Sequence, residues 1–127
     1  MGTRSLTVFK QEDGQEIAVL YRQHDGYYEG HGKELVKFLK DKKITNGISG
    51  KDTFNGMNCL TASVIAYFKD SVGGFYLYPA GRRDINEEYI YTVSGKAGDN
   101  QATIEMYDFS RKRIILKPKL ENEKVGA

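Results

Sequence analysis

The sequence predicts an α+β domain: an antiparallel sheet of about six strands with two helices packed on one face. β-prone runs occur near both ends of the chain and are separated by glycine-containing turns. Between them lie two segments whose apolar residues recur at helical spacing. The resulting order, β-β-α-α-β-β-β-β, keeps strands and helices in separate blocks, which is typical of the α+β class.

The N-terminal elements follow from a turn and a helical stripe. β-prone runs at 4–10 and 16–23 flank Asp13-Gly14, a dipeptide typical of tight turns, so this region predicts a hairpin. A glycine-containing loop at 24–32 then leads into a helix over about 32–42. The apolar stripe of that helix consists of Leu35, Val36, Phe38 and Leu39.

A polar connector with no regular structure is expected at 43–56, followed by a second helix over roughly 56–71. Gly73-Gly74 is expected to end this helix, because glycine enters the left-handed cap conformation without strain. The stripe predicted to pack on the sheet consists of Met57, Leu60, Val64 and Phe68.

The rest of the chain is predicted to be strand. Short turns join these runs, which indicates an antiparallel meander, and the charged tail at 118–127 is expected to fray. We find no repeat and no linker, so residues 1–127 are interpreted as one domain. The four runs span 75–79, 88–94, 102–108 and 113–117.

Composition limits the possible functions. Hydrophobic residues make up 39% and charged residues 28%, which is typical of a folded chain. The net charge of +2 is too small for a duplex DNA binder. Cys59 is the only cysteine, which excludes an internal disulfide and a cysteine-based zinc site. Since neither a signal peptide nor a membrane span is recognised, we expect a cytoplasmic protein.

The main candidate site is the segment 21–33, which joins a strand to a helix. Gly26, Gly30 and Gly32 would let an anion approach unpaired N–H groups at the helix start, with Arg22 and Lys33 adding positive charge. The P-loop pattern is not met, since a tyrosine stands where its first glycine belongs. The alternative interpretation is a tight turn whose glycines need positive φ.

Other residues of this segment complete the predicted ligand site. His24, Asp25, Tyr27 and His31 are counted among its contacts. Histidines and carboxylates are also metal-ligand types, but no standard spacing is present, so no metal is expected. Cys59 lies on a small-residue helix flank, which favours a buried structural role over a catalytic thiol.

A second basic focus is Arg82-Arg83, within a tyrosine-rich C-terminal half. Stacking on tyrosine rings, combined with arginine and lysine charge, could bind a nucleotide or a single strand. The alternative is that charges solvate turns and tyrosines line sheet faces. The tyrosines concerned are Tyr76, Tyr78, Tyr89, Tyr91 and Tyr107, and further cations are Arg111, Lys112, Arg113, Lys117 and Lys119.

Met1-Gly2-Thr3-Arg4-Ser5 and the run from His24-Asp25-Gly26-Tyr27 to Gly32 support a resemblance. They are similar to a group of short uncharacterised proteins of tailed bacteriophages, bacteria and some fungi. The similarity covers about the first 40 residues and implies a phage or prophage accessory gene. It implies no activity and transfers no functional residue.

We therefore expect a non-catalytic binding protein of phage type that captures an anionic small ligand such as a nucleotide, without a cofactor. The alternative is a protein-interaction module that docks a host or virion protein through a sheet edge or the 43–56 connector. A small hydrolase comes third. An N-terminal nucleophile would need trimming to Thr3 or Ser5, because Gly2 has no nucleophilic side chain. A homo-oligomer is also possible.

Overall fold

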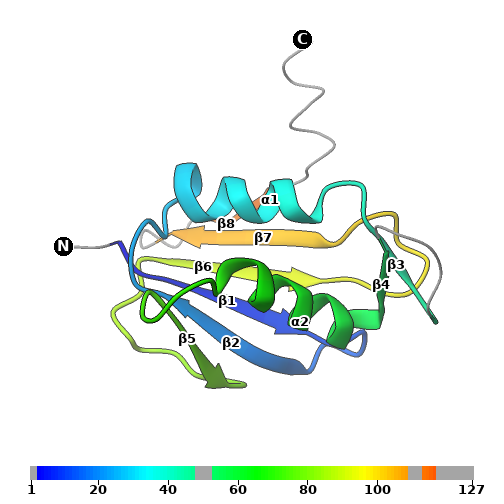
Figure 1. Ribbon diagram of the computed structural model, residues 1–127, viewed down its shortest axis with the longest axis horizontal. Coiled ribbons are helices and arrows are strands. Elements are labelled where there is room, and N and C mark those ends of the chain that lie inside the picture. Colours follow the sequence, from blue (N-terminus) through cyan, green and yellow to red (C-terminus); the bar gives the residue numbers. More distant parts are fainter. Residues whose placement is uncertain (1–2, 48–52, 109–112, 117–127) are drawn as a thin grey trace, which may run out of the picture.

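The computed structural model describes residues 3–47, 53–108 and 113–116, which form a six-stranded sheet with both helices lying over one face (Figure 1). The α+β class, the six-stranded sheet and the helix pair are confirmed. The strands run in the order β5-β2-β1-β6-β7-β8. They are β1 (Ser5–Lys10), β2 (Glu16–Arg22), β5 (Phe75–Pro79), β6 (Tyr89–Ser94), β7 (Thr103–Asp108) and β8 (Arg113–Leu116), and the helices are α1 (Lys33–Leu39) and α2 (Gly56–Phe68).

The sheet is mixed rather than wholly antiparallel, because β1 and β6 pair in parallel. The expected four-strand meander holds only for β6, β7 and β8. The strand β5 instead pairs with β2 at the sheet edge, so the 80–88 connection must cross β2 and β1 to reach β6. This crossover lies on the face away from the helices, where Ile85 packs against Leu6, Val8 and their neighbours.

Strand alternation divides the core into two apolar clusters, one on each face of the sheet. On the helix face, Phe9 and Leu20 lie under α2, whose predicted stripe is buried as expected. On the far face, Leu6 and Val8 pair across the ladder with Tyr21 and Val19. That apolar surface on β1 and β2 needs a cover, which explains why the crossover runs there rather than through solvent.

Two expectations about the middle of the chain are wrong. The connector contains two short parallel strands in its described parts, β3 (Lys43–Thr45) and β4 (Thr53–Asn55), which bury Ile44 and Phe54 beside α2. The second helix ends at Phe68, before Gly73-Gly74, because Lys69 already has an extended backbone. The two glycines have positive φ but turn the loop into β5 instead of capping the helix. The tail predicted to fray lies outside the described residues.

We predict that Leu60→Ala lowers the free energy of unfolding by about 2–5 kcal/mol, because the Leu60 side chain is fully buried at the centre of α2. Val72→Ala is the matched control, since Val72 is fully exposed and its truncation should change stability by less than about 0.5 kcal/mol. Urea unfolding followed by circular dichroism measures both. Equal effects of the two substitutions would contradict the placement of α2.

Candidate functional site

The loop between β2 and α1 does not leave free amide donors at residues 30–33. The chain passes through η1 (Tyr28–Gly32), a π-helical turn that continues directly into α1. The N–H of Gly30 donates to the Tyr27 carbonyl at 3.1 Å, and that of His31 to the Asp25 carbonyl at 2.9 Å. The Gly32 and Lys33 N–H groups also donate to carbonyls of the loop. The predicted backbone anion cradle is therefore wrong: internal hydrogen bonds occupy its donors.

The alternative explanation of the glycines, positive φ, is also wrong. In this loop Asp25 has φ 61°, whereas Gly26, Gly30 and Gly32 do not adopt positive φ. Each glycine is instead a point of close approach. An added Cβ would lie 2.6 Å from the Ser5 Cβ at Gly26, 2.5 Å from the Asp25 carbonyl oxygen at Gly30, and 2.7 Å from a ring carbon of Tyr28 at Gly32.

The most unusual side chain in the loop is His31, which is fully buried against the rings of Phe68 and Tyr91. Its Nε2 lies 2.6 Å from the Thr7 hydroxyl, and its Nδ1 lies 3.3 Å from an Arg22 guanidinium nitrogen. Arginine can only donate, so Nδ1 accepts and Nε2 carries the proton that is donated to Thr7. Burial, reinforced by the Arg22 charge, lowers the pKa of His31 to about 3. The predicted ligand contact is thus a neutral structural group.

Arg22 is held in place by the same cluster. Its Nε donates to the His24 carbonyl at 2.7 Å, and its guanidinium lies 4.9 Å from the Phe75 ring centroid and 5.8 Å from that of Phe68. The Tyr91 hydroxyl donates to the Gly26 carbonyl at 2.7 Å, and burial raises the pKa of that phenol. These bonds fasten the loop to the sheet, so Arg22 and Gly26 serve the fold.

The remaining predicted residues of the loop are exposed. Lys33 forms an exposed ion pair with Glu29 at 3.2 Å, and the Tyr27 hydroxyl donates to the Asp25 carboxylate at 3.1 Å. His24 is exposed beside them. In the part of the chain that the structure describes, no three metal-ligating side chains gather to hold an ion.

The hydrolase interpretation named Thr3 and Ser5 as nucleophiles, and burial excludes only Ser5, since Thr3 is half-buried. Ser5 is fully buried inside β1, and its hydroxyl has no hydrogen-bond partner. Thr7 and His31 place a hydroxyl beside an imidazole, but both side chains are fully buried. Cys59 is half-buried and packs at the margin of the helix-face core. A nucleophile must meet substrate, and Ser5 and Thr7 cannot do so in this fold.

The two predicted arginines have different surroundings. The Arg83 guanidinium pairs with the Glu16 carboxylate at 2.8 Å and is half-buried, which ties the crossover to the start of β2. This hydrogen-bonded pairing lowers the pKa of Glu16. Arg82 is exposed, and its guanidinium lies 4.8 Å from the centroid of the Tyr78 ring.

Tyr21, Tyr76 and Tyr78, together with Lys69 and Arg82, form what we call the tyrosine surface. Tyr76 and Tyr78 alternate along β5 and share the far face with Tyr21, whose ring centroid is 6.0 Å and 6.1 Å from theirs. The Lys69 ammonium lies 5.6 Å from the Tyr76 ring centroid, and 44% of Tyr76 is exposed. Exposed aromatic area and positive charge thus coincide at this edge.

Only part of the tyrosine set predicted from the sequence comes together here. Tyr89 and Tyr91 stack near the helix-face core, with ring centroids 6.5 Å apart. Tyr107 lines a separate hollow. Lys69 was not predicted as a site residue. The feature that could have identified it is its position between the second helix and the aromatic strand that follows.

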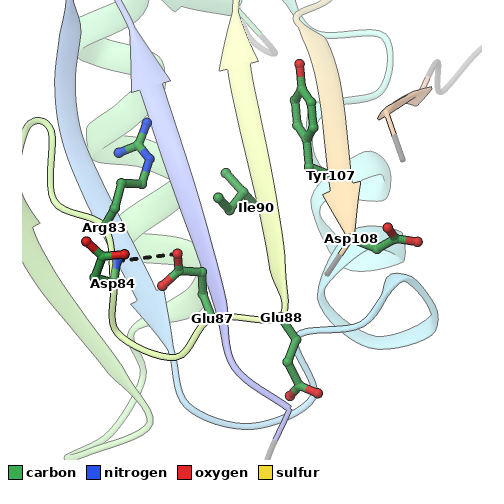
Figure 2. A pocket seen from close by; sticks show the side chains of 7 residues that line it. All are labelled: Arg83, Asp84, Glu87, Glu88, Ile90, Tyr107 and Asp108. Carbon is green, nitrogen blue, oxygen red and sulfur yellow. Dashed lines mark hydrogen bonds between the residues drawn. The ribbon is translucent and has the colours of Figure 1, made fainter. Parts of the chain in front are cut away.

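That hollow, of about 430 Å³, lies on the same far face, over β6 and β7 (Figure 2). It carries four carboxylates, and the Arg83 beside them is already paired with Glu16. The Glu87 carboxylate accepts the N–H groups of Asp84 and Ile85, which fixes the end of the crossover. Among the described residues of its lining, carboxylates outnumber cations, so we call it the acidic hollow. Its lining consists of Arg83, Asp84, Glu87, Glu88, Ile90, Tyr107 and Asp108.

No family model, curated protein or solved structure matches this chain. The resemblance of the first 40 or so residues to phage-type proteins therefore stays a prediction. Among the described residues, no helix combines the length and apolar character needed to cross a membrane.

We predict that burial of neutral His31 makes stability depend on pH. Its pKa is about 3 in the folded protein, whereas a histidine in the unfolded chain titrates near ~6.5. Between these values the unfolded chain binds a proton that the folded protein excludes. The free energy of unfolding should therefore be unaffected above about pH 6.5 and fall below it, approaching about 1.4 kcal/mol per pH unit.

Urea titrations between about pH 7 and pH 5, above the range of most carboxylates, measure this slope. His31→Gln should flatten the slope, whereas His24→Gln should leave it intact because His24 is exposed. An unchanged slope in His31→Gln would contradict the burial of His31.

We predict that Gly32→Ala destabilises the fold by about 1–3 kcal/mol, because its Cβ would overlap the ring of Tyr28. Lys33→Ala, one residue along, should change stability by less than about 0.5 kcal/mol, since its ion pair is exposed. Thermal and urea unfolding of both variants provide the comparison. The reverse order of effects would show that the loop is not closely packed.

Proposed function

We propose that the protein is a non-catalytic binding protein that captures an anionic small ligand with a flat ring, such as a nucleotide, on the tyrosine surface. The observation that carries this proposal is the coincidence of exposed Tyr76 with the Lys69 ammonium and the Arg82 guanidinium. A nucleotide has the matching parts, since its base can stack on an aromatic ring and its phosphates attract cations.

The contacts of both cations support this assignment. The Lys69 ammonium is positioned by the carbonyls of Gly73 and Phe75, at 3.2 Å and 3.0 Å, rather than by a carboxylate. The exposed Arg82 guanidinium is positioned by the Tyr78 ring, whereas its neighbour Arg83 is neutralised by Glu16. Fixed side chains lose less conformational freedom when a ligand binds, which favours affinity.

The acidic hollow on the same face favours the tyrosine surface as the place where an anionic ligand binds. The carboxylates in its described lining make the hollow over β6 and β7 a poorer site for phosphate than the edge formed by β2 and β5. If the resemblance to phage-type proteins holds, capture of a nucleotide would make this an accessory protein that withdraws a ligand from its host.

A second candidate function, protein docking, is favoured by one specific observation. Tyr67, Val72, Tyr76 and Leu77 are large exposed apolar side chains that all lie between the end of α2 and β5. Tyr76 and Leu77 both belong to the edge strand β5, so a protein partner that docks at this sheet edge can contact them together.

We predict that Tyr76→Ala weakens ATP binding by about 1–3 kcal/mol, the usual value of a base stacked on an aromatic ring. Arg82→Ala should weaken binding by a similar amount through loss of a charged contact. Isothermal titration calorimetry measures the dissociation constants, and adenosine alone should bind more weakly than ATP because it lacks phosphates.

Tyr67→Ala is the matched control for Tyr76→Ala. Tyr67 is 45% exposed, close to the value for Tyr76, but stacks on Phe38 away from the tyrosine surface. Its truncation should leave ATP affinity unchanged. Equal losses in the two variants, or no binding of any nucleotide by the unmodified protein, would refute the assignment.

A further inference from the structure

The outer edge of β5 has a backbone arrangement that can be read from its pairing with β2. The Gly74 carbonyl accepts the N–H of Gln23, so Gly74 faces β2. Backbone direction alternates along a strand, so Tyr76 and Tyr78 also direct their N–H and carbonyl groups to β2. Phe75, Leu77 and Pro79 therefore direct theirs outward, away from the sheet.

Two of these three outward positions are already partly occupied. The Phe75 carbonyl accepts from the Lys69 ammonium at 3.0 Å, and the Pro79 carbonyl accepts from the N–H of Arg82 at 3.3 Å. Pro79 has no N–H to offer. Leu77 has both backbone groups facing outward, and 58% of the residue is exposed. Lysine and proline protect natural edge strands against open-ended pairing. This edge can therefore pair only with a strand that needs neither an N–H from Pro79 nor an unoccupied carbonyl at Phe75.

We propose that the partner is a second copy of this chain, paired antiparallel through β5 about a two-fold axis at Leu77. This register places Leu77 opposite the partner's Leu77, Tyr76 opposite the partner's Tyr78, and Phe75 opposite the partner's Pro79. The sequence Tyr76-Leu77-Tyr78 is the same in both directions, so a two-fold pairing sets like residues on like faces.

The hydrogen-bonding groups are complementary in this register. Each Leu77 exchanges its N–H and carbonyl with its copy, and each Phe75 N–H meets the carbonyl of the partner's Pro79. The bond that would complete the ladder runs from Pro79, which lacks an N–H, to the Phe75 carbonyl, which Lys69 already satisfies. The missing donor therefore leaves no acceptor unpaired.

Pairing would also join the two tyrosine surfaces into one. Tyr76 and the partner's Tyr78 become cross-strand neighbours, so rings from both copies line a single aromatic surface. The same register brings Lys69 near the partner's Arg82, and their repulsion makes the dimer stronger at high salt. This inference rests on the backbone of β5 and holds whether or not a nucleotide binds.

A cysteine at the axis gives a direct test. In a Cys59→Ala background, Leu77→Cys should form a disulfide with its own copy, because hydrogen-bonded residues in an antiparallel pair have Cα atoms about 5.5 Å apart. Val72→Cys is the control, since Val72 is more exposed but lies outside β5. Oxidation at about 0.5 M salt, where charge repulsion is screened, should crosslink the first variant rapidly and the second only slowly. Equal crosslinking of the two variants would overturn the proposal.

Sedimentation of the unmodified protein over a range of concentrations should show a monomer–dimer equilibrium. Leu77→Lys should raise the dissociation constant of the dimer by at least about tenfold, because it places two like charges at the axis. Val72→Lys should leave the equilibrium unchanged. Amide exchange at Leu77 should slow as the dimer forms, and thermal unfolding verifies that each variant is folded. If the unmodified protein stays monomeric at all concentrations, the proposal is overturned, whatever the result of nucleotide titration.

Discussion

Burial of β1 on both of its faces is the constraint on which the rest of the structure depends. Leu6 and Val8 are fully buried on one side, and Ser5, Thr7 and Phe9 on the other. A strand buried on both sides needs two covers. The helices supply one, and the crossover from β5 to β6 supplies the other. In the same topology β5 lies outside β2, where it forms the edge on which the proposed functions depend.

The helix face of β1 has an additional requirement, because the polar side chain of Thr7 is buried there. Thr7 is satisfied by His31, and His31 in turn by Arg22, so one chain of contacts reaches from the middle of the sheet to the loop before α1. Buried polar groups that lack partners are costly, which fixes the loop in place once Thr7 is buried. Residue types that suggest ligand binding are thereby used to hold the fold together.

The far face carries two surfaces of opposite character. The tyrosine surface, at the edge formed by β2 and β5, presents aromatic rings beside Lys69 and Arg82. The acidic hollow over β6 and β7 presents carboxylates. The crossover contributes to both, with Arg82 at one end and Glu87 and Glu88 at the other. A near-neutral net charge therefore conceals a local separation of charge, which bears on where an anion can bind.

The sequence by itself determined the two helices and the six strands of the main sheet, because their signals are local, but not the short strands β3 and β4. Asp13-Gly14 predicted the hairpin and the α2 stripe predicted its buried side, both as found. Strand neighbours and partners were decided by tertiary structure alone. Nothing local places β5 beside β2, buries His31 against Thr7, or pairs Arg83 with Glu16, because each contact joins residues far apart in the chain and depends on which surfaces need cover.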